Sequence, residues 1–281
     1  MPGTLFVVAT PIGNLEDITT RALRVLREVA LIAAEDTRRT AQLLTRYGIQ
    51  TPTTSLHEHN EAAKSASLIG RLMRGDAIAL VSDAGTPTVS DPGQRLILQA
   101  IQSGVRIEPI PGPSAVITAL AASGFPSDAF RFMGFPPVRP KDRTEWLKAL
   151  GSVAGTVVFF EAPHRIRRTL EEIKFSVGDQ PVVLCRELTK AHEELVRGPI
   201  SVALERLSAV KGEFTVVIEI GRMAEHMPAQ RPSASALAQE LDQMTERGGL
   251  SKRECISELA KRYGIPTNEV YKLIEKGKNS V

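Results

Sequence analysis

The chain has few cysteines and few aromatic residues, and each shortage excludes a class of protein. Only two cysteines occur in 281 residues, Cys185 and Cys255, and no metal-ligand spacing surrounds either one. This excludes a framework of structural disulfides, and a reduced, intracellular protein is expected. Aromatic residues make up 5% of the chain, with Trp146 as the single tryptophan, which argues against a platform on which many bases stack.

Long hydrophobic runs and several common motifs are also missing. Apolar stretches such as 77–81 stop at the length of a strand, so no membrane span is expected. The first apolar run opens directly into an expected strand, so we expect no signal peptide and a cytoplasmic location. There is no G-x-G-x-x-G, P-loop, G-x-S-x-G or H-E-x-x-H, which weakens the case for nucleotide-fold methyltransferases and NAD enzymes.

The spacing of the histidines does not predict a metal site. His57 and His59 are two residues apart, and no third ligand lies nearby. A polar loop explains this spacing better than a metal centre does, so no metal is expected.

The remaining composition is that of a folded protein with a slightly basic surface. Hydrophobic residues make up 42% and charged residues 24% of the chain, and the formal net charge is +3. This charge permits an anionic partner without requiring one. The length accommodates two ordinary domains and a small third unit.

Strand-like and helix-like segments alternate through the first part of the chain. Strands are expected at 5–9, 31–34, 77–81 and 105–110, and helices at 19–29, 37–47, 61–74, 93–102 and 114–122. This alternation predicts an α/β domain, residues 1–124, with a mostly parallel sheet covered by helices on both faces.

The stretch 125–143, which carries four prolines, marks the first expected domain boundary. Beyond it, a helix is expected from Thr144, with Asp142 and Glu145 as a capping box. Further strands are expected at 156–160, 181–185 and 214–220, and helices at 165–175 and 200–207. This pattern predicts a second α/β domain, residues 125–221.

The rest of the chain is expected to be a linker, 222–233, and a helical unit, 234–281. Two short helices are expected, from a capping box at Ser251 and Glu254 to Tyr263 and then from Pro266 to Ile274, which suggests a helix-turn-helix-like unit. Seven basic and four acidic residues from position 251 onward leave this segment with a charge of +3. A packing appendage or a dimer clasp explains the segment equally well.

Three rigid loops follow strands of the first expected sheet: 10–14, 82–93 and 111–115. The carboxyl edge of an open α/β sheet is where such folds bind ligands. Gly85 and Gly93 allow close backbone approach, and Ser114 can cap a helix whose free N–H groups favour an anionic group. One such loop is an ordinary turn, but three at one edge favour a cofactor crevice.

Taken in order, seven motifs resemble a known family over residues 4–221. They are Ala9 to Leu15 (ATPIGNL), Ala34 to Arg38 (AEDTR), His57 to Glu61 (HEHNE), Val81 to Pro87 (VSDAGTP), Pro111 to Ala115 (PGPSA), Pro163 to Arg165 (PHR) and Arg186 to Lys190 (RELTK). The chain resembles the tetrapyrrole methylase-like (class III) methyltransferases, and more closely the bacterial 16S rRNA (cytidine-2′-O)-methyltransferases.

This resemblance implies a homodimer of two α/β domains of the tetrapyrrole methylase fold, with S-adenosylmethionine in the cleft between them. The cofactor-binding residues it implies are Pro11, Ser82, Asp83, Thr86, Ser114, Ala115, Glu161 and Leu188. Ser82 stands where the porphyrin-precursor enzymes usually carry glycine. The implied substrate is a cytidine of 16S rRNA in the small ribosomal subunit, with no membrane involved.

Methyl transfer to a ribose hydroxyl needs a proton acceptor or a stabilised oxyanion. Glu35, Asp36 and Glu187 are candidate bases and Lys190 a candidate charge stabiliser, of which we favour Asp36 and Lys190. Salt bridges to Arg38, Arg39 and Glu193 are an equally good explanation of those two residues. Phosphate contacts are expected from Arg38, Arg39, Arg139, Lys141 and Arg165, with Arg143, Arg167 and Arg168 as further candidates.

Two other functions fit the same sequence. One is a small-molecule methyltransferase of the same fold that acts on a tetrapyrrole. The other is a regulator in which the helical unit reads nucleic acid and the α/β part senses a ligand. The AEDTR and HEHNE motifs argue against the first, and a helical unit that is dispensable for turnover would argue against the second.

Overall fold

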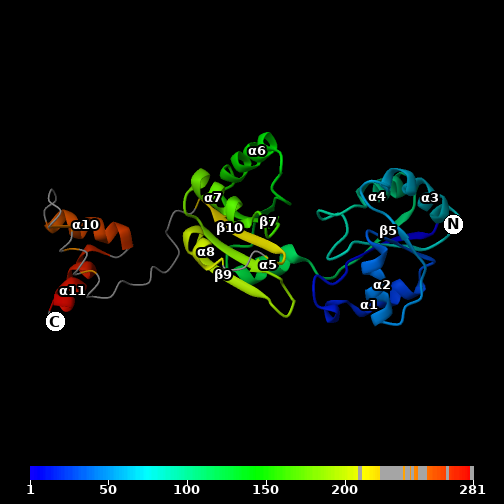
Figure 1. The fold of residues 1–281 in the computed structure, drawn as a ribbon, viewed down its shortest axis with the longest axis horizontal. Helices are drawn as coiled ribbons and strands as arrows, with labels where there is room; N and C mark the ends of the chain where they lie inside the picture. Colours follow the sequence, from blue (N-terminus) through cyan, green and yellow to red (C-terminus); the bar gives the residue numbers. More distant parts are fainter. Residues whose placement is uncertain are drawn as a thin grey trace. The chain divides into compact units, whose positions relative to one another are not determined.

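The computed structural model describes residues 1–207, 211–221, 237, 241, 244–245, 252–263 and 266–278. The chain divides into two compact units, Met1–Gly221 and Arg222–Val281. The first unit holds two five-stranded sheets (Figure 1). No described helix is both long enough and apolar enough to cross a membrane.

The first sheet is wholly parallel, with the order β3-β2-β4-β1-β5. Its strands are β1 (Thr4–Val8), β2 (Leu31–Ala34), β3 (Thr53–Ser55), β4 (Ile78–Val81) and β5 (Arg106–Ile110). The expected parallel sheet is confirmed. The short polar strand β3 escaped prediction because Thr-Thr-Ser carries no hydrophobic pattern.

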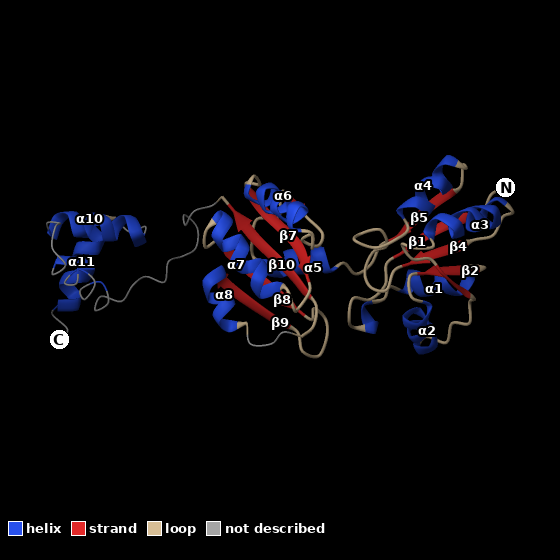
Figure 2. Cartoon of the chain, turned by 45° about the horizontal axis from the view of Figure 1, so that its top comes forward, coloured by secondary structure: helices blue, strands red, loops and turns tan. Residues whose placement is uncertain are grey.

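Helices cover both faces of this sheet (Figure 2). They are α1 (Thr20–Glu28), α2 (Thr37–Arg46), α3 (Glu61–Met73) and α4 (Gln94–Gln102), with a 3₁₀ turn η1 (Leu15–Asp17). Ile32 and Ala79 pack with α1 and α2, whereas Leu31 and Leu80 pack with α3 and α4. Because successive residues point to opposite faces, β4 is buried along its whole length.

The second sheet has the order β6-β7-β10-β8-β9 and is mostly antiparallel. Its strands are β6 (Phe130–Phe132), β7 (Gly155–Glu161), β8 (Pro181–Arg186), β9 (Glu194–Pro199) and β10 (Phe214–Ile220). Only β6 and β7 pair in parallel. The two edge strands β6 and β9 were missed, since β6 is largely exposed, β9 is mostly half-buried, and neither has a buried apolar run.

Four helices pack on this second sheet: α5 (Ala115–Ser123), α6 (Pro140–Gly151), α7 (Ile166–Val177) and α8 (Ile200–Arg206). Val116 and Leu120 of α5 join a cluster with Val158 and Val217. Helix α5 therefore packs with the second sheet, whereas the boundary expected at 124 and 125 placed it in the first domain.

Helix α6 corrects the helix start and the capping expected from the sequence. It begins at Pro140 rather than Thr144, and its N-cap residue Arg139 makes no side-chain capping bond. Asp142 lies inside the first turn, so it cannot form the expected capping box with Glu145. Proline starts this helix because its fixed φ suits the first turn and its missing N–H is not needed there.

The second unit contains the two expected helices, α10 (Lys252–Tyr263) and α11 (Thr267–Lys278), drawn in orange and red in Figure 1. Their apolar residues share a cluster with Leu237 and Leu241. The linker expected at 222–233 and the capping residue Ser251 lie outside the described residues.

Candidate functional site

The three loops singled out in the sequence meet at the carboxyl edge of the first sheet. Thr10 N–H donates to the Gly85 carbonyl at 2.8 Å, and Gly85 N–H donates back to Thr10 at 3.0 Å. The Thr86 hydroxyl donates to the Pro113 carbonyl at 3.5 Å. A Cβ on Gly112 would lie 3.0 Å from the Ala9 side chain, so the third loop also approaches closely. The predicted convergence of the loops is confirmed.

Unusual backbone conformations gather in two loops. Among the described residues, the non-glycine residues with positive φ are Thr88, Ser90, Glu187 and Thr189. Such conformations cost free energy and persist only where the surrounding structure enforces them, which happens often at functional sites. The first pair lies in the loop 82–93, and the second pair flanks Leu188.

Carboxylates crowd together where β2 and β4 end. Asp83 N–H donates to Glu35 Oε2 at 3.3 Å, and Asp36 N–H donates to Asp83 Oδ1 at 2.9 Å. Arg39 is the cation beside them, with Nη1 3.4 Å from Asp83 Oδ2. We call Glu35, Asp83 and Asp91 the acidic cluster.

Burial and repulsion between carboxylates raise the pKa of two members of this acidic cluster, Glu35 and Asp91. Burial raises the pKa of Asp91 to about 6, the charges of Glu35 and Asp83 add to the rise, and the Ser82 hydroxyl opposes it. Burial also raises the pKa of Glu35, against a hydrogen bond from the Asp83 backbone. A cation placed here would relieve the repulsion.

Asp91 was not selected from the sequence, although it belongs to the loop 82–93. The available signal was an acid shortly before a helix, on a loop that also carries Asp83. Asp83 comes shortly after β4, as Glu35 comes directly after β2. Only the fold shows that these three carboxylates influence one another.

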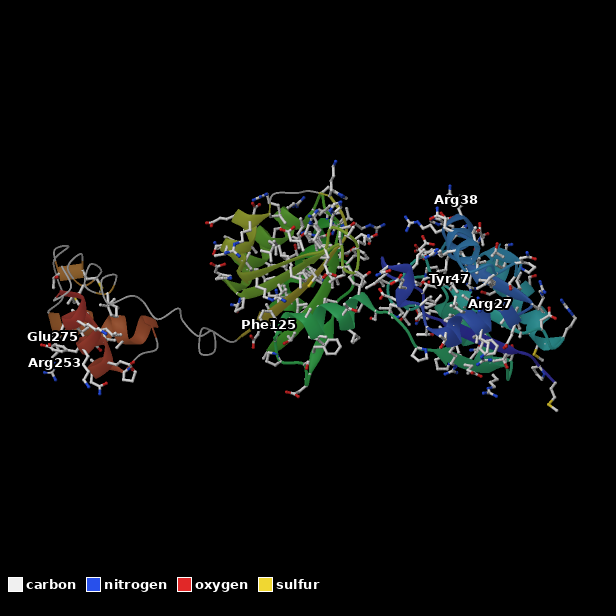
Figure 3. The ribbon with its side chains drawn as sticks, turned by 90° about the horizontal axis from the view of Figure 1, so that it is seen from below. Arg27, Arg38, Tyr47, Phe125, Arg253 and Glu275 are labelled. Carbon is white, nitrogen blue, oxygen red and sulfur yellow. The ribbon has the colours of Figure 1, made fainter. Side chains whose placement is uncertain are left out.

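Asp36 has a different position from the one expected of a catalytic base. Its carboxylate caps α2 by accepting the Arg38 N–H at 2.8 Å, and it pairs with the Arg38 side chain at 2.7 Å. The hydrogen bonds from Arg38 lower the pKa of Asp36 to about 2. Asp36 is therefore a poor proton acceptor at neutral pH. Figure 3 shows Arg38 at the outer surface.

Lys190 lies between two carboxylates. Its Nζ is 2.9 Å from Glu187 Oε1 and 2.9 Å from Glu213 Oε2. Burial alone would lower the pKa of Lys190, but the hydrogen bonds to Glu213 and Glu187 outweigh it and raise the pKa. Burial would likewise raise the pKa of Glu187, but its bond to Lys190 and the backbone bond from Glu213 lower it overall. Lys190 is thus a fixed cation and Glu187 a weak base.

The loop that carries Lys190 contacts the first of the three loops. Asn14 N–H donates to the Thr189 hydroxyl at 3.0 Å. A Cβ on Gly13 would lie 2.5 Å from Lys190 Cγ, so only glycine fits there without a shift. Lys190 is consequently positioned next to the loop that follows β1.

Glu161 and Arg165 belong to a buried network rather than to an open site. Glu161 is 1% exposed, accepts hydrogen bonds from Ala162 N–H and the Thr169 hydroxyl, and pairs with Arg165 at 3.2 Å. Arg165 also donates to the Pro136 carbonyl. These contacts use the carboxylate of Glu161, so a cofactor contact through that carboxylate would have to replace one of them, and they turn Arg165 inward.

Arg143 extends the same network. It is buried, pairs with Glu172 at 2.5 Å and donates to Thr169 at 2.7 Å. Arg168 pairs with the same Glu172 at 2.7 Å. Arg143 therefore cannot serve as the phosphate contact suggested by the sequence without breaking this network.

The other expected site residues differ in how much of them is accessible. Pro11 and Ser82 are buried, and the Leu188 side chain is buried in a cluster with Val116. Ser114 is the N-cap of α5 but makes no side-chain capping bond, so the expected cap is absent. The residues Asp83, Thr86 and Ala115 are half-buried, and Arg38, Arg39, Arg139 and Lys141 are exposed.

No group of three or more His, Cys, Asp or Glu side chains suited to a metal ion occurs within the described ranges. His57 Nε2 instead lies 3.0 Å from Asn60 Nδ2. The loop between β3 and α3 is therefore organised by Asn60, which also accepts the His57 N–H at 2.9 Å.

Comparison with known sequences identifies the family. The profile of the Tetrapyrrole (Corrin/Porphyrin) Methylases matches residues 4–203. The chain belongs to this family. It is 43% identical over 274 residues to a Halalkalibacterium halodurans protein named ribosomal RNA small subunit methyltransferase I, covering 96% of this chain and 94% of that one. A protein of the same name from Escherichia coli O157:H7 is 43% identical over 277 residues, with the same coverage.

Solved structures share the fold. A uroporphyrin-III-C-methyltransferase from Thermus thermophilus superposes with a TM-score of 0.55 at 20% identity, over 77% of this chain and 94% of that one. A diphthine synthase superposes with a TM-score of 0.61 at 17% identity, over 77% and 90%. The chain therefore has the tetrapyrrole methylase fold, as predicted from the sequence.

Proposed function

We propose that the protein transfers a methyl group from S-adenosylmethionine to the 2′-oxygen of a cytidine in 16S rRNA of the small ribosomal subunit. We further propose that it acts in the cytoplasm as a homodimer. The observation that carries the proposal is the 43% identity, over 96% of the chain, to ribosomal RNA small subunit methyltransferase I. The convergence of the three loops in the tetrapyrrole methylase fold supports it.

The residues at the loop convergence fit the chemistry of S-adenosylmethionine. This cofactor carries two cations, a sulfonium and an ammonium, and the acidic cluster offers negative charge to them. Its carboxylate suits the N-terminus of α5, which has no side-chain cap. Gly85 and Gly112 leave room for close approach of the ligand.

We assign the cofactor to Pro11, Ser82, Asp83, Thr86, Ser114 and Ala115, with Leu188 contributing through its backbone. Glu161 drops out because its carboxylate is already used. When bound, the cofactor supplies an activated methyl group, and the protein's task is to align the acceptor hydroxyl with it.

The chain's own groups handle the proton and the developing charge. Lys190 is a cation held by Glu187 and Glu213, suited to stabilise an oxyanion. Asp91, whose pKa of about 6 lies near neutral pH, replaces Asp36 as our candidate proton acceptor. Arg38, Arg39, Arg139 and Lys141 are exposed and are assigned to phosphates.

The decisive experiment is mass spectrometry of small-subunit RNA from cells with and without this gene. We expect one 2′-O-methylcytidine to disappear on deletion and to return with the wild-type gene but not with Asp83→Asn. A ribose-methyl mark that persists after deletion would contradict the proposal. In a parallel assay, methyl transfer to free tetrapyrroles, with none to small subunits, would favour the small-molecule alternative.

A further inference from the structure

An exposed apolar segment joins the second sheet to α6. In the segment 130–141, Phe130 is 39% exposed, Phe135 52% and Val138 79%. The same segment contains three basic residues, Arg131, Arg139 and Lys141, and no acidic one. Exposed aromatic and basic side chains thus lie close together in the sequence of this segment.

The Phe135 ring is held from one side. Its centroid lies 5.3 Å from that of Phe160, and Phe160 in turn lies 5.0 Å from Phe132 in an edge-to-face arrangement. Phe160 N–H donates to the Gly134 carbonyl at 2.9 Å, which fixes the backbone next to Phe135. The ring is therefore positioned before any ligand arrives, while about half of its surface is open.

This ring lies beside the candidate site. Gly134 has a positive φ of 59°, and a Cβ there would be 3.6 Å from the Ser90 hydroxyl. Ser90 is one of the strained residues of the loop 82–93 and precedes Asp91. Phe135 is thus next to the loop to which we assign the cofactor and the proton acceptor.

Unpaired positive charge accompanies the ring. Arg131, Arg139 and Lys141 are all exposed, and none of them forms an ion pair within the part of the chain that the structure describes. Arg139 is the N-cap residue of α6, where the helix dipole disfavours a cation. An anionic partner would reduce the repulsion between these positive charges. It would also interact favourably with the N-terminus of α6.

We infer that Phe135 stacks on an unpaired base of the RNA substrate, at or beside the nucleotide that is methylated, while Arg139 and Lys141 neutralise the adjoining phosphates. This inference rests on the proposed function and names how that site holds its substrate. A nucleotide offers a π face and a negative phosphate a few ångströms apart, which matches a ring flanked by cations. The low aromatic content excludes an extended stacking platform but not a single anchored ring.

The test compares two exposed phenylalanines of the same unit. Phe135→Ala removes the ring in question, and Phe175→Ala removes a ring of α7 that is 95% exposed and plays no part in the site. Phe135→Trp restores a stacking surface. The probe is a single-stranded oligocytidylate that carries one fluorescent pyrrolocytidine, so that anisotropy reports binding and fluorescence quenching reports stacking.

We expect Phe135→Ala to weaken binding of this probe by about 10- to 100-fold and to abolish the quenching. Phe135→Trp should retain both signals, and Phe175→Ala should match the wild type. Affinity for S-adenosylmethionine, measured by calorimetry, should be the same in all four proteins. A merely structural role for Phe135 would not produce quenching that depends on the ring.

Equal binding and equal quenching in wild type and Phe135→Ala would overturn the inference, as would a wild-type protein that does not bind the probe. A protein that captures the probe through Phe135 but methylates no small-subunit RNA would support the stacking role and refute the proposed function. With active enzyme, we expect Phe135→Ala to raise KM for small subunits more than it lowers kcat.

Discussion

Carboxylates of the two sheets have contrasting surroundings. At the edge of the first sheet, Glu35, Asp83 and Asp91 repel one another, and burial and repulsion raise the pKa of Asp91 to about 6. On the second sheet, Glu161 is 1% exposed yet fully supplied with partners, which include Arg165 and the Thr169 hydroxyl. Glu35 and Asp83 come shortly after β2 and β4, and Glu161 is the last residue of β7.

This contrast distinguishes a carboxylate that stabilises the fold from carboxylates that are available to bind a ligand. A buried carboxylate with every oxygen used contributes to folding and has nothing left for a ligand. Carboxylates that repel one another destabilise the free protein, and a bound cation removes that cost. The same residue types therefore point to a packed core in one sheet and to a binding site in the other.

The largest expected effect on stability comes from substituting Glu161, the carboxylate paired with Arg165. Glu161→Gln leaves Arg165 without its counter-charge in a buried place, and we expect it to lower the free energy of unfolding by about 3–5 kcal/mol. Denaturant titration measures this loss. Affinity for S-adenosylmethionine should be unchanged at temperatures where the variant is folded, and a selective loss of that affinity would restore Glu161 to the site.

Asp91→Asn is expected to raise the free energy of unfolding at neutral pH, whereas Glu161→Gln lowers it. Because the folded protein raises the pKa of Asp91 from 3.8 to about 6, folding favours the neutral form, and this contribution is lost as the pH rises through 6. At pH 7.5 the variant should be more stable than the wild type by about 1 kcal/mol, a figure reduced for partial exposure. At pH 3.5 the two should unfold alike. If the variant and the wild type were equally stable at both pH values, the folded protein would not disfavour the charged form of Asp91.

Smaller effects, on melting temperature and on methyl transfer, show whether Asp36 caps α2 or acts as the catalytic base. Asp36→Asn keeps an oxygen that accepts the Arg38 N–H, so melting temperature and methyl transfer should both stay close to wild type. Asp36→Ala should lower the melting temperature by a few degrees, because α2 loses its cap. A large loss of turnover in Asp36→Asn, with cofactor affinity retained, would show that Asp36 is the base after all.

The smallest effect is expected at an exposed arginine. Arg38→Ala should reduce the slope of log affinity for single-stranded RNA against log salt concentration by about 0.7. Arg24→Ala, which removes another exposed arginine with an acidic partner on its own helix, is the control and should leave the slope unchanged. Identical slopes in the two variants would remove Arg38 from the RNA-binding surface.

Sequence reasoning succeeded where local pattern and fold agree. Buried strands such as β4 are uninterrupted apolar runs, and the loops that follow them contain glycine and proline at positions that need them. Because parallel strands end at the same edge, the meeting of loops 10–14, 82–93 and 111–115 followed from their order alone. The family resemblance added the fold of the second sheet.

Sequence reasoning failed where the deciding partner is distant in the chain. The role of Asp91 depends on Glu35, more than fifty positions earlier. The partners of Glu161, Arg165 and Thr169, are near in the chain, but the sequence does not show that its carboxylate is buried with them. Short edge strands such as β6 have no hydrophobic alternation to reveal them. Asp36 shows a further ambiguity, since an acid before a helix is equally suited to capping and to catalysis.

The most direct test of the account is a calorimetric titration of S-adenosylmethionine into the purified wild-type protein and Asp83→Asn at pH 7.5. Asparagine preserves the oxygen that accepts Asp36 N–H but removes a negative charge from the acidic cluster. We predict that the wild type binds and that the variant binds at least about tenfold more weakly, equivalent to about 1.4 kcal/mol, while unfolding no more easily. Equal affinities, or no binding by the wild type, would contradict the claim that these crowded carboxylates form the binding site for a cationic cofactor.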